Sequence, residues 1–147
     1  MTIFNLIQNK AVPSFCTSNI EVLKIIILYC KRKKLPCLIE STSNQVNQFG
    51  GYSGKTPQEF YNNIKKILKK NNFSSRNFYM GGDHLGPLPW KKKNEKTAVN
   101  NSDQLVNKCL DSNYSKIHVD TSIKCINDKT INHSIIFDRT KYILQNS

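Results

Sequence analysis

The chain has 147 residues, of which 38% are hydrophobic, and it carries a formal net charge of +12. This composition excludes wholesale disorder, because it supplies enough apolar material for the core of one ordinary domain. The longest apolar run, 25–30, is far shorter than the roughly 20 residues that a membrane-spanning helix needs, so no membrane association is expected.

The cysteines and the N-terminus indicate the cellular compartment. The chain has five cysteines, an odd number, and none of them forms a C-x-x-C pair. The N-terminus has no basic segment followed by an apolar signal core. We therefore expect reduced thiols and a cytoplasmic location.

Basic residues are concentrated in runs at 31–34, 65–70 and 91–93. The first two runs fall where predicted helices end, and cations there interact favourably with the helix dipole. A nucleic-acid surface would gather such runs on one face with aromatic residues between them. A basic nucleic-acid binder is therefore the least favoured function class, and no nucleic-acid partner is expected.

The first predicted elements are a short amphipathic helix over 2–8 and an extended segment over 12–16. Ser18 or Asn19 can cap a helix over 20–33. The three isoleucines inside that segment are β-branched and locally favour a strand, but its length and its terminal lysines favour a helix. A compact apolar strand over 37–40 follows.

A glycine-rich loop over 49–54 comes next, and a clear helix start follows it. Thr56 is the cap, Pro57 lies in the first turn and Glu59 completes a capping box. The order of strand, polar loop and helix then repeats. Strands are predicted over 78–81 and 116–120, and helices are predicted from 101 or 102 to 110 and from about 134 onward.

Repeated strand and helix units with short connections predict parallel strands joined by right-handed crossovers. Two architectures fit this pattern: a doubly wound open sheet and half of a (β/α)8 barrel. No G-x-G-x-x-G follows the first strand, which weighs against a dinucleotide-binding sheet. A barrel needs eight strands, about twice what this chain supplies.

The residue pair most suggestive of chemistry lies at the end of the third strand, in the segment Gly81-Gly82-Asp83-His84-Leu85-Gly86-Pro87. An acid beside an imidazole suits metal-assisted carbonyl chemistry, in which one group moves a proton and the other holds a cation. Asp83 could equally accept backbone N–H bonds and shape a turn. His84 alone is not a zinc site, because catalytic zinc needs about three protein ligands plus an open position.

The fourth strand offers two further polar residues. His118 and Asp120 are two positions apart, so they share one face of a strand. If that face is a barrel interior, Asp120 lies near the active mouth and His118 lies one layer below. The two could complete a site with His84, although packing and hydrogen bonding is the favoured account.

The loop at 50–54 precedes a helix N-terminus, whose amides could receive a phosphate or a sugar hydroxyl. Its glycines could equally serve only to permit positive φ in a tight turn. Tyr52 and Trp90 could line a sugar or could be rim packing.

Three segments resemble the GatZ/KbaZ family, the Z-type subunit of D-tagatose-1,6-bisphosphate aldolase. They are 40–52 (ESTSNQVNQFGGY), 81–87 (GGDHLGP) and, more weakly, 116–122 (KIHVDTS). The resemblance runs from about residue 15 to residue 144. It implies the N-terminal half of a TIM (β/α)8 barrel, with about four parallel strands alternating with helices in a single truncated domain over 1–147.

The resemblance also implies roles for individual residues at the carboxyl ends of the strands. In class II aldolases an Asp-His pair ending the third strand supplies a proton-transfer carboxylate and a zinc ligand, which makes Asp83 and His84 the candidates for these roles. Candidate substrate-binding residues are Asn44, Gln45, Gly51, Tyr52, Asp120 and Ser122. The other zinc ligands of that wider group lie on later strands, so zinc is implied by the resemblance but is not expected to be held by this chain alone.

Four positions depart from the family pattern. After Gly86-Pro87 the family usually has Asn, another residue and Trp, whereas Leu88-Pro89-Trp90 keeps the Trp but loses the amide. Asn19, Asn47 and Thr121 stand where the family commonly has His, Asp and Cys. Each difference is expected to remove a polar or ionisable group near the active face.

The family function that the resemblance implies is that of an auxiliary, non-catalytic subunit, which supports the stability and activity of a catalytic class II aldolase subunit in tagatose and galactitol catabolism. The alternative is a metal-dependent sugar-phosphate 4-epimerase or aldolase-like enzyme that acts by retro-aldol chemistry. A half-barrel also leaves two strand edges open and its inner apolar face uncovered, so either a catalytic aldolase subunit or self-association is expected to cover it.

Overall fold

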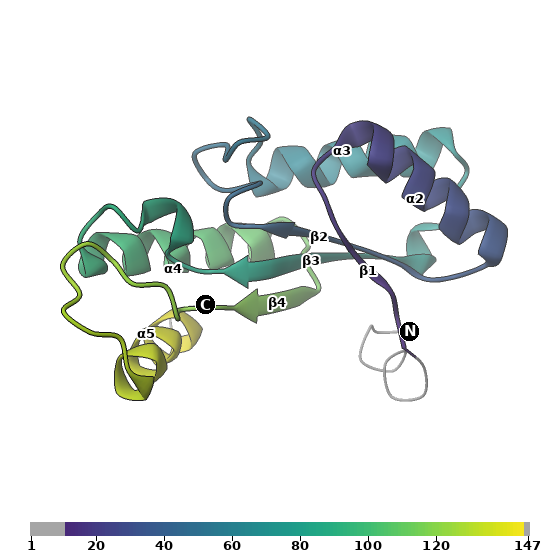
Figure 1. Cartoon of the computed structure of the whole chain (residues 1–147). Helices are drawn as coiled ribbons and strands as arrows, with labels where there is room; N and C mark the ends of the chain where they lie inside the picture. The colour runs from purple at the N-terminus through teal and green to yellow at the C-terminus, as the bar shows by residue number, and fades with distance from the viewer. Residues whose placement is uncertain (1–10, 146–147) are drawn as a thin grey trace.

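The computed structural model describes residues 11–145, so the helix predicted over 2–8 lies outside the described residues (Figure 1). The strands are β1 (Ser14–Cys16), β2 (Cys37–Thr42), β3 (Phe78–Leu85) and β4 (Lys116–Val119). They form a four-stranded sheet in the order β1-β2-β3-β4, and every neighbouring pair is parallel. Within residues 11–145 this order never reverses, as it would in a doubly wound sheet, and so the fold is that of half a (β/α)8 barrel.

The helices α2 (Ile20–Lys33), α3 (Pro57–Lys70), α4 (Glu95–Asp111) and α5 (His133–Gln145) alternate with the strands, and two short 3₁₀ turns, η1 (Ser75–Asn77) and η2 (Leu88–Trp90), flank β3. The expected starts of α2 and α3 are confirmed: Asn19 caps α2, and Thr56 and Glu59 form a capping box on α3. No helix among the described residues is long and apolar enough to cross a bilayer.

The predicted start of α4 at 101 or 102 was wrong. The helix begins at Glu95, because the Asn94 side chain caps it by accepting a 2.9 Å hydrogen bond from the Thr97 amide. Ala98 and Val99 are buried in its first turns, although the surrounding residues are polar. The fourth strand ends at Val119, one residue earlier than expected.

The core lies between the sheet and the helices, which cover one of its faces (Figure 1). Ile39 and Met80 are partners in the β2–β3 register and are almost fully buried. They belong to one cluster with Ile27 of α2, Phe60 of α3 and Leu105 of α4, among others. Burial of Ile26 and Ile27 on one side of the helix therefore explains why α2 is helical despite its β-branched residues.

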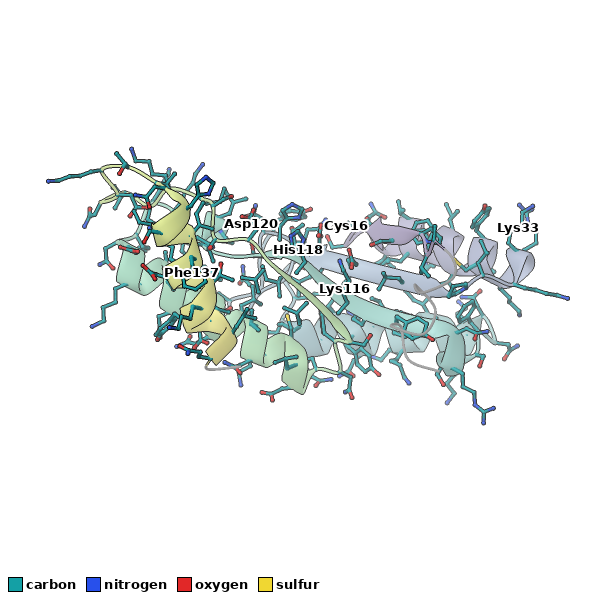
Figure 2. All side chains as sticks on the ribbon, turned by 90° about the horizontal axis from the view of Figure 1, so that it is seen from below. Cys16, Lys33, Lys116, His118, Asp120 and Phe137 are labelled. Atoms are coloured by element: carbon teal, nitrogen blue, oxygen red, sulfur yellow. The ribbon has the colours of Figure 1, made fainter. Side chains whose placement is uncertain are left out.

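The face of the sheet opposite the helices is polar toward the carboxyl ends of the strands. Glu40 of β2 and Lys116 of β4 form an ion pair of 2.5 Å across Gly81. A Cβ on Gly81 would lie 2.7 Å from Glu40 Oε1, so the glycine leaves room for this carboxylate. Lys116, His118 and Asp120 follow one another along this face (Figure 2). The expectation of an apolar inner face was wrong here, because these alternate strand positions carry charged and polar residues.

Candidate functional site

An irregularity at the carboxyl end of β3 brings Asp83 and His84 together. Neighbouring strand residues normally point to opposite faces of a sheet. Here Gly82 pairs with Ile117 but Leu85 pairs with Val119, so β3 has one residue more than β4 between the two pairs. His84 takes a positive φ of 49° at this bulge. Bulges change the direction in which side chains point. This one allows the side chains of Asp83 and His84 to contact each other although they are neighbours in the strand.

The group that results consists of Asp83, His84 and His118. Asp83 Oδ1 lies 2.9 Å from His118 Nδ1, and Asp83 Oδ2 lies 2.9 Å from His84 Nδ1. The two imidazole rings meet edge to face, with centroids 4.5 Å apart. One ligand atom from each of the three residues lies within 4.8 Å of the others. Two imidazole nitrogens and one carboxylate oxygen are a donor set that fits zinc.

The Asp83 carboxyl is held in its ionised form. Burial by itself would raise its pKa, but the hydrogen bonds with His118 and His84, together with the charge of Lys116, outweigh this effect and lower the pKa below its ordinary value. An ionised carboxylate between two imidazoles can accept a proton or ligate a cation.

Cys16, at the end of β1, adds a thiol to the same end of the sheet (Figure 2). Its Sγ donates a weak 3.6 Å hydrogen bond to Gln45 Oε1. Burial, followed by the negative charges of Asp83 and Glu40, raises the pKa of this thiol to about 11. Because the thiolate is the reactive form, Cys16 is a poor nucleophile at neutral pH.

Asp120 and Ser122 begin the loop after β4. Asp120 Oδ1 accepts hydrogen bonds from the Ser122 amide at 2.9 Å and the Ser122 hydroxyl at 2.6 Å. Burial would raise the pKa of Asp120, but these bonds and the nearby His84 and His118 lower it. A Cβ on Gly86 would lie 1.7 Å from the Asp120 carbonyl oxygen, so only glycine allows the two loops to approach this closely.

The loop between β2 and α3 folds on itself. The Asn44 carbonyl accepts a hydrogen bond from the Tyr52 amide, and Gln45 Oε1 accepts one from the Thr42 amide, both at 2.9 Å. Gly51 has a φ of +55°, and a Cβ there would lie 2.5 Å from the Gln45 carbonyl oxygen. The turn therefore requires a glycine at position 51 for its own geometry. Among the candidate substrate-binding residues of this loop, Tyr52 has the most exposed side chain, at 72%, and it is the one free to contact a ligand.

Trp90 in η2 packs on the loop after β2, in an edge-to-face contact with Phe49 at 6.2 Å between ring centroids. Both rings therefore lie at the rim near the carboxyl ends of β2 and β3. This contact gives Trp90 the rim-packing role that was one of its two expected roles.

The chain matches the family model described as D-tagatose-1,6-bisphosphate aldolase subunit GatZ/KbaZ-like over residues 5–146. The chain belongs to this family. It is 39% identical over 121 residues to the D-tagatose-1,6-bisphosphate aldolase subunit GatZ of Escherichia coli K12 and of Escherichia coli O139:H28, a match that covers 82% of this chain. The chain spans 29% of the length of these curated relatives.

A solved structure shares the fold. A probable tagatose 6-phosphate kinase from Sinorhizobium meliloti 1021 superposes with a TM-score of 0.88 and 33% sequence identity. The match covers 93% of this chain and 36% of the other. This likeness supports the assignment of the sheet to a barrel-type architecture.

Asn19, Asn47 and Thr121, three of the positions that depart from the family pattern, make hydrogen bonds that shape the backbone around them. Thr121 is buried and donates a 2.9 Å hydrogen bond to the Ile136 carbonyl of α5. Asn47 is buried inside its loop, where its Oδ1 accepts from the amides of Phe49 and Gly51. An aspartate could accept the same bonds. Asn19 is the cap of α2.

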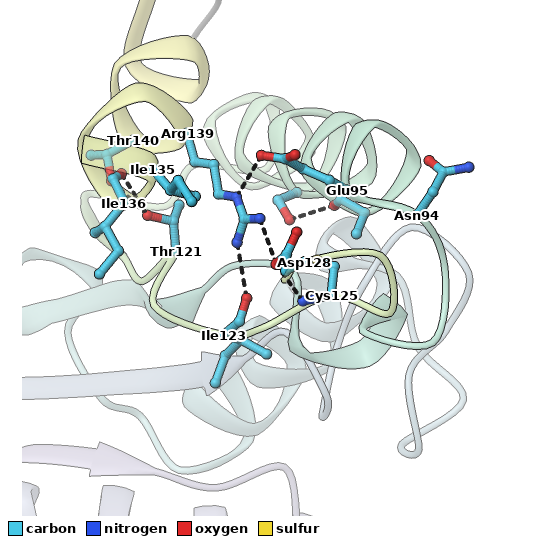
Figure 3. A network of polar contacts seen from close by, with 12 residues as sticks. Asn94, Glu95, Thr121, Ile123, Cys125, Asp128, Ile135, Ile136, Arg139 and Thr140 are labelled. Atoms are coloured by element: carbon cyan, nitrogen blue, oxygen red, sulfur yellow. Dashed lines mark hydrogen bonds and ion pairs between the residues drawn. The ribbon is translucent and has the colours of Figure 1, made fainter. Parts of the chain in front are cut away.

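A buried arginine that sequence analysis did not single out fixes the loop after β4 (Figure 3). Arg139 of α5 is 3% exposed and contacts Asp128 Oδ2 at 2.6 Å, Glu95 Oε1 at 2.9 Å and the Ile123 carbonyl at 3.0 Å. These bonds join α5, the start of α4 and the loop that follows Asp120. The network therefore helps to hold the β4 end of the candidate site in place.

Proposed function

We propose that this chain is an auxiliary subunit of a cytoplasmic class II D-tagatose-1,6-bisphosphate aldolase, acting in tagatose and galactitol catabolism. In this role it supports the stability and activity of a separate catalytic subunit. The observation that carries the proposal is the open sheet: among the described residues, β1 pairs only with β2 and β4 pairs only with β3. The family to which the chain belongs is described as an aldolase subunit, which supports the same role.

The open edges come with exposed apolar side chains on the adjacent helices. Ile25 on α2 is 66% exposed, with Val22 and Leu28 on the same side of the helix, and Phe137 on α5 is 64% exposed. α2 directly follows β1, and α5 follows β4. Unpaired strand edges and apolar patches of this kind are typical of surfaces that another chain covers. A catalytic aldolase subunit is the proposed partner, and self-association is the alternative.

Co-purification with a class II tagatose-bisphosphate aldolase catalytic subunit tests the proposal. We expect the two chains to co-elute in size-exclusion chromatography and the catalytic subunit to gain thermal stability and activity. An Ile25→Asp/Phe137→Asp variant should lose this effect, whereas Lys66→Asp on α3 is the matched control on a surface away from the sheet edges. Separate elution, with no change in the catalytic subunit, would refute the proposal.

A second function is favoured by a different observation, the contact of Asp83 with two imidazoles. We propose as the alternative that the chain acts on a sugar phosphate by retro-aldol chemistry, as a metal-dependent 4-epimerase or aldolase-like enzyme. Asp83 would transfer the proton and His84 would hold the metal. Epimerisation of tagatose 6-phosphate by the purified chain alone, abolished by Asp83→Asn, would support this reading. Turnover equal to a blank without protein would exclude it.

A further inference from the structure

We propose that Asp83, His84 and His118 form a zinc site held entirely by this chain, with His118 as the third ligand. This inference does not rest on the auxiliary-subunit proposal, because it concerns metal binding by the chain alone. It differs from the expectation taken from class II aldolases, in which the carboxylate at position 83 transfers a proton instead of binding the metal and the remaining ligands come from later strands. The fourth strand of this chain supplies one instead.

The distances between the three side chains suit a tetrahedral zinc ion. Ligand atoms at zinc bond lengths of 2.0–2.1 Å are about 3.3 Å apart in a tetrahedron. The Asp83 oxygens lie 2.9 Å from the Nδ1 atoms of His84 and His118, and one atom from each residue lies within 4.8 Å of the others. Small movements of these side chains would therefore let the three ligand atoms surround the ion.

The local charge also favours a cation. The Asp83 carboxylate contacts both imidazoles, and Asp120 lies two positions after His118 in the chain. Lys116 is nearby, but its ammonium is paired with Glu40. With both imidazoles neutral, as metal ligation requires, the two nearby aspartates leave a local negative charge in a chain whose net charge is +12. This local excess of negative charge attracts a divalent cation.

The site is also open on one side. The side chains of His84 and His118 are 58% and 45% exposed, so three protein ligands would leave a position for water or a substrate oxygen. Three ligands and one open position are the arrangement of catalytic rather than structural zinc. The bulge and the positive φ of His84 add a backbone conformation that is sparsely populated and tends to occur at ligand sites.

Cobalt spectroscopy on the tag-free protein tests the site. The chain has three histidines, so His133, exposed at the start of α5, provides a matched control. We expect the unmodified chain and His133→Gln to bind one Co²⁺ with visible absorption bands that Zn²⁺ removes. His84→Gln, His118→Gln and Asp83→Asn should bind at least about 100-fold more weakly. Binding by His118→Gln equal to that of the unmodified chain would overturn the assignment.

A second measurement needs no variant and so does not depend on a variant folding. Diethylpyrocarbonate modifies accessible imidazoles, and mass spectrometry locates the modified residues. Zn²⁺ should protect His84 and His118 while His133 remains reactive. Equal modification of all three histidines with and without Zn²⁺ would refute the proposal.

Discussion

Asp83 and His118 lie 35 positions apart in the chain, yet their side chains meet at 2.9 Å across β3 and β4. Both strands are therefore needed to assemble the candidate site. Displacement of the end of β4 would separate His118 from Asp83 even if β3 stayed intact. The glycine at position 86 and the Arg139 network, which hold the segment after β4, thus matter for the site without touching it.

The first prediction concerns Asp83 and pH. Because the pKa of Asp83 is lowered in the folded chain, its contribution to stability is complete above the pKa of an unfolded aspartate and is lost as the pH falls through the folded value. Asp83→Asn should cost about 1 to 3 kcal/mol at pH 7. The difference from the unmodified chain should shrink in acid.

Urea unfolding at pH 7 and at about pH 3 measures this effect. Asp138→Asn, on the exposed side of α5, is the control and should change stability little at either pH. A destabilisation by Asp83→Asn that is equal at both pH values would show that the carboxylate is not the stabilising form.

The second prediction separates the two acidic partners of Arg139. The Asp128 and Arg139 side chains are 4% and 3% exposed, whereas the Glu95 side chain is 51% exposed. Removing one partner of a buried pair leaves an uncompensated charge, so Asp128→Ala should cost about 3 to 5 kcal/mol. Glu95→Gln, which removes a solvent-exposed charge, should cost less than about 1 kcal/mol. Thermal or urea unfolding of the two variants gives the comparison, and equal losses would contradict it.

The helices and strands were largely predictable because the sequence patterns that specify them are local. Asn19, Thr56 and Glu59 make the hydrogen bonds of helix caps, and such caps are readable over four residues of sequence. The α4 start was missed because its first two turns expose polar residues and bury only a few small apolar ones, which weakens the helical period.

The candidate site was predictable only in part. Sequence spacing placed His118 and Asp120 on one face of the predicted fourth strand. The contact of His118 with Asp83, however, depends on the bulge in β3, and the register between distant strands has no local signal. The buried Arg139 is similar. An arginine within the α5 sequence gives no sign that a loop eleven residues earlier supplies the aspartate that neutralises it.

The third prediction concerns close approach at Gly86. A Cβ there would lie 1.7 Å from the Asp120 carbonyl oxygen, a backbone atom that cannot move without shifting the end of β4. Gly86→Ala should therefore destabilise the fold by about 3 kcal/mol or more, the upper range for overpacking. Gly54→Ala is the control: it has positive φ but nothing within 4 Å of its Cβ, so it should cost only about 1 kcal/mol. Urea unfolding of both variants decides between steric and conformational causes, and equal costs would rule out the steric one.

The fourth prediction uses Cys16 to probe the charge of the site. Cys30, Cys37, Cys109 and Cys125 are buried, so Cys16 is the thiol that reagents reach in the folded chain. Its pKa of about 11, raised by burial and by the charges of Asp83 and Glu40, leaves little thiolate at pH 7.5. Alkylation by iodoacetamide should therefore be slow and should accelerate as the pH approaches 11.

Removing the nearby carboxylate should lower that pKa and speed the reaction. We expect Asp83→Asn to alkylate Cys16 several-fold faster at pH 7.5, while Asp138→Asn leaves the rate unchanged. Peptide mass spectrometry over a time course measures both rates and confirms that the four buried thiols stay unmodified. An unchanged rate in Asp83→Asn would mean that the carboxylate does not act on the thiol, and would place Cys16 outside the electrostatic reach of the candidate site.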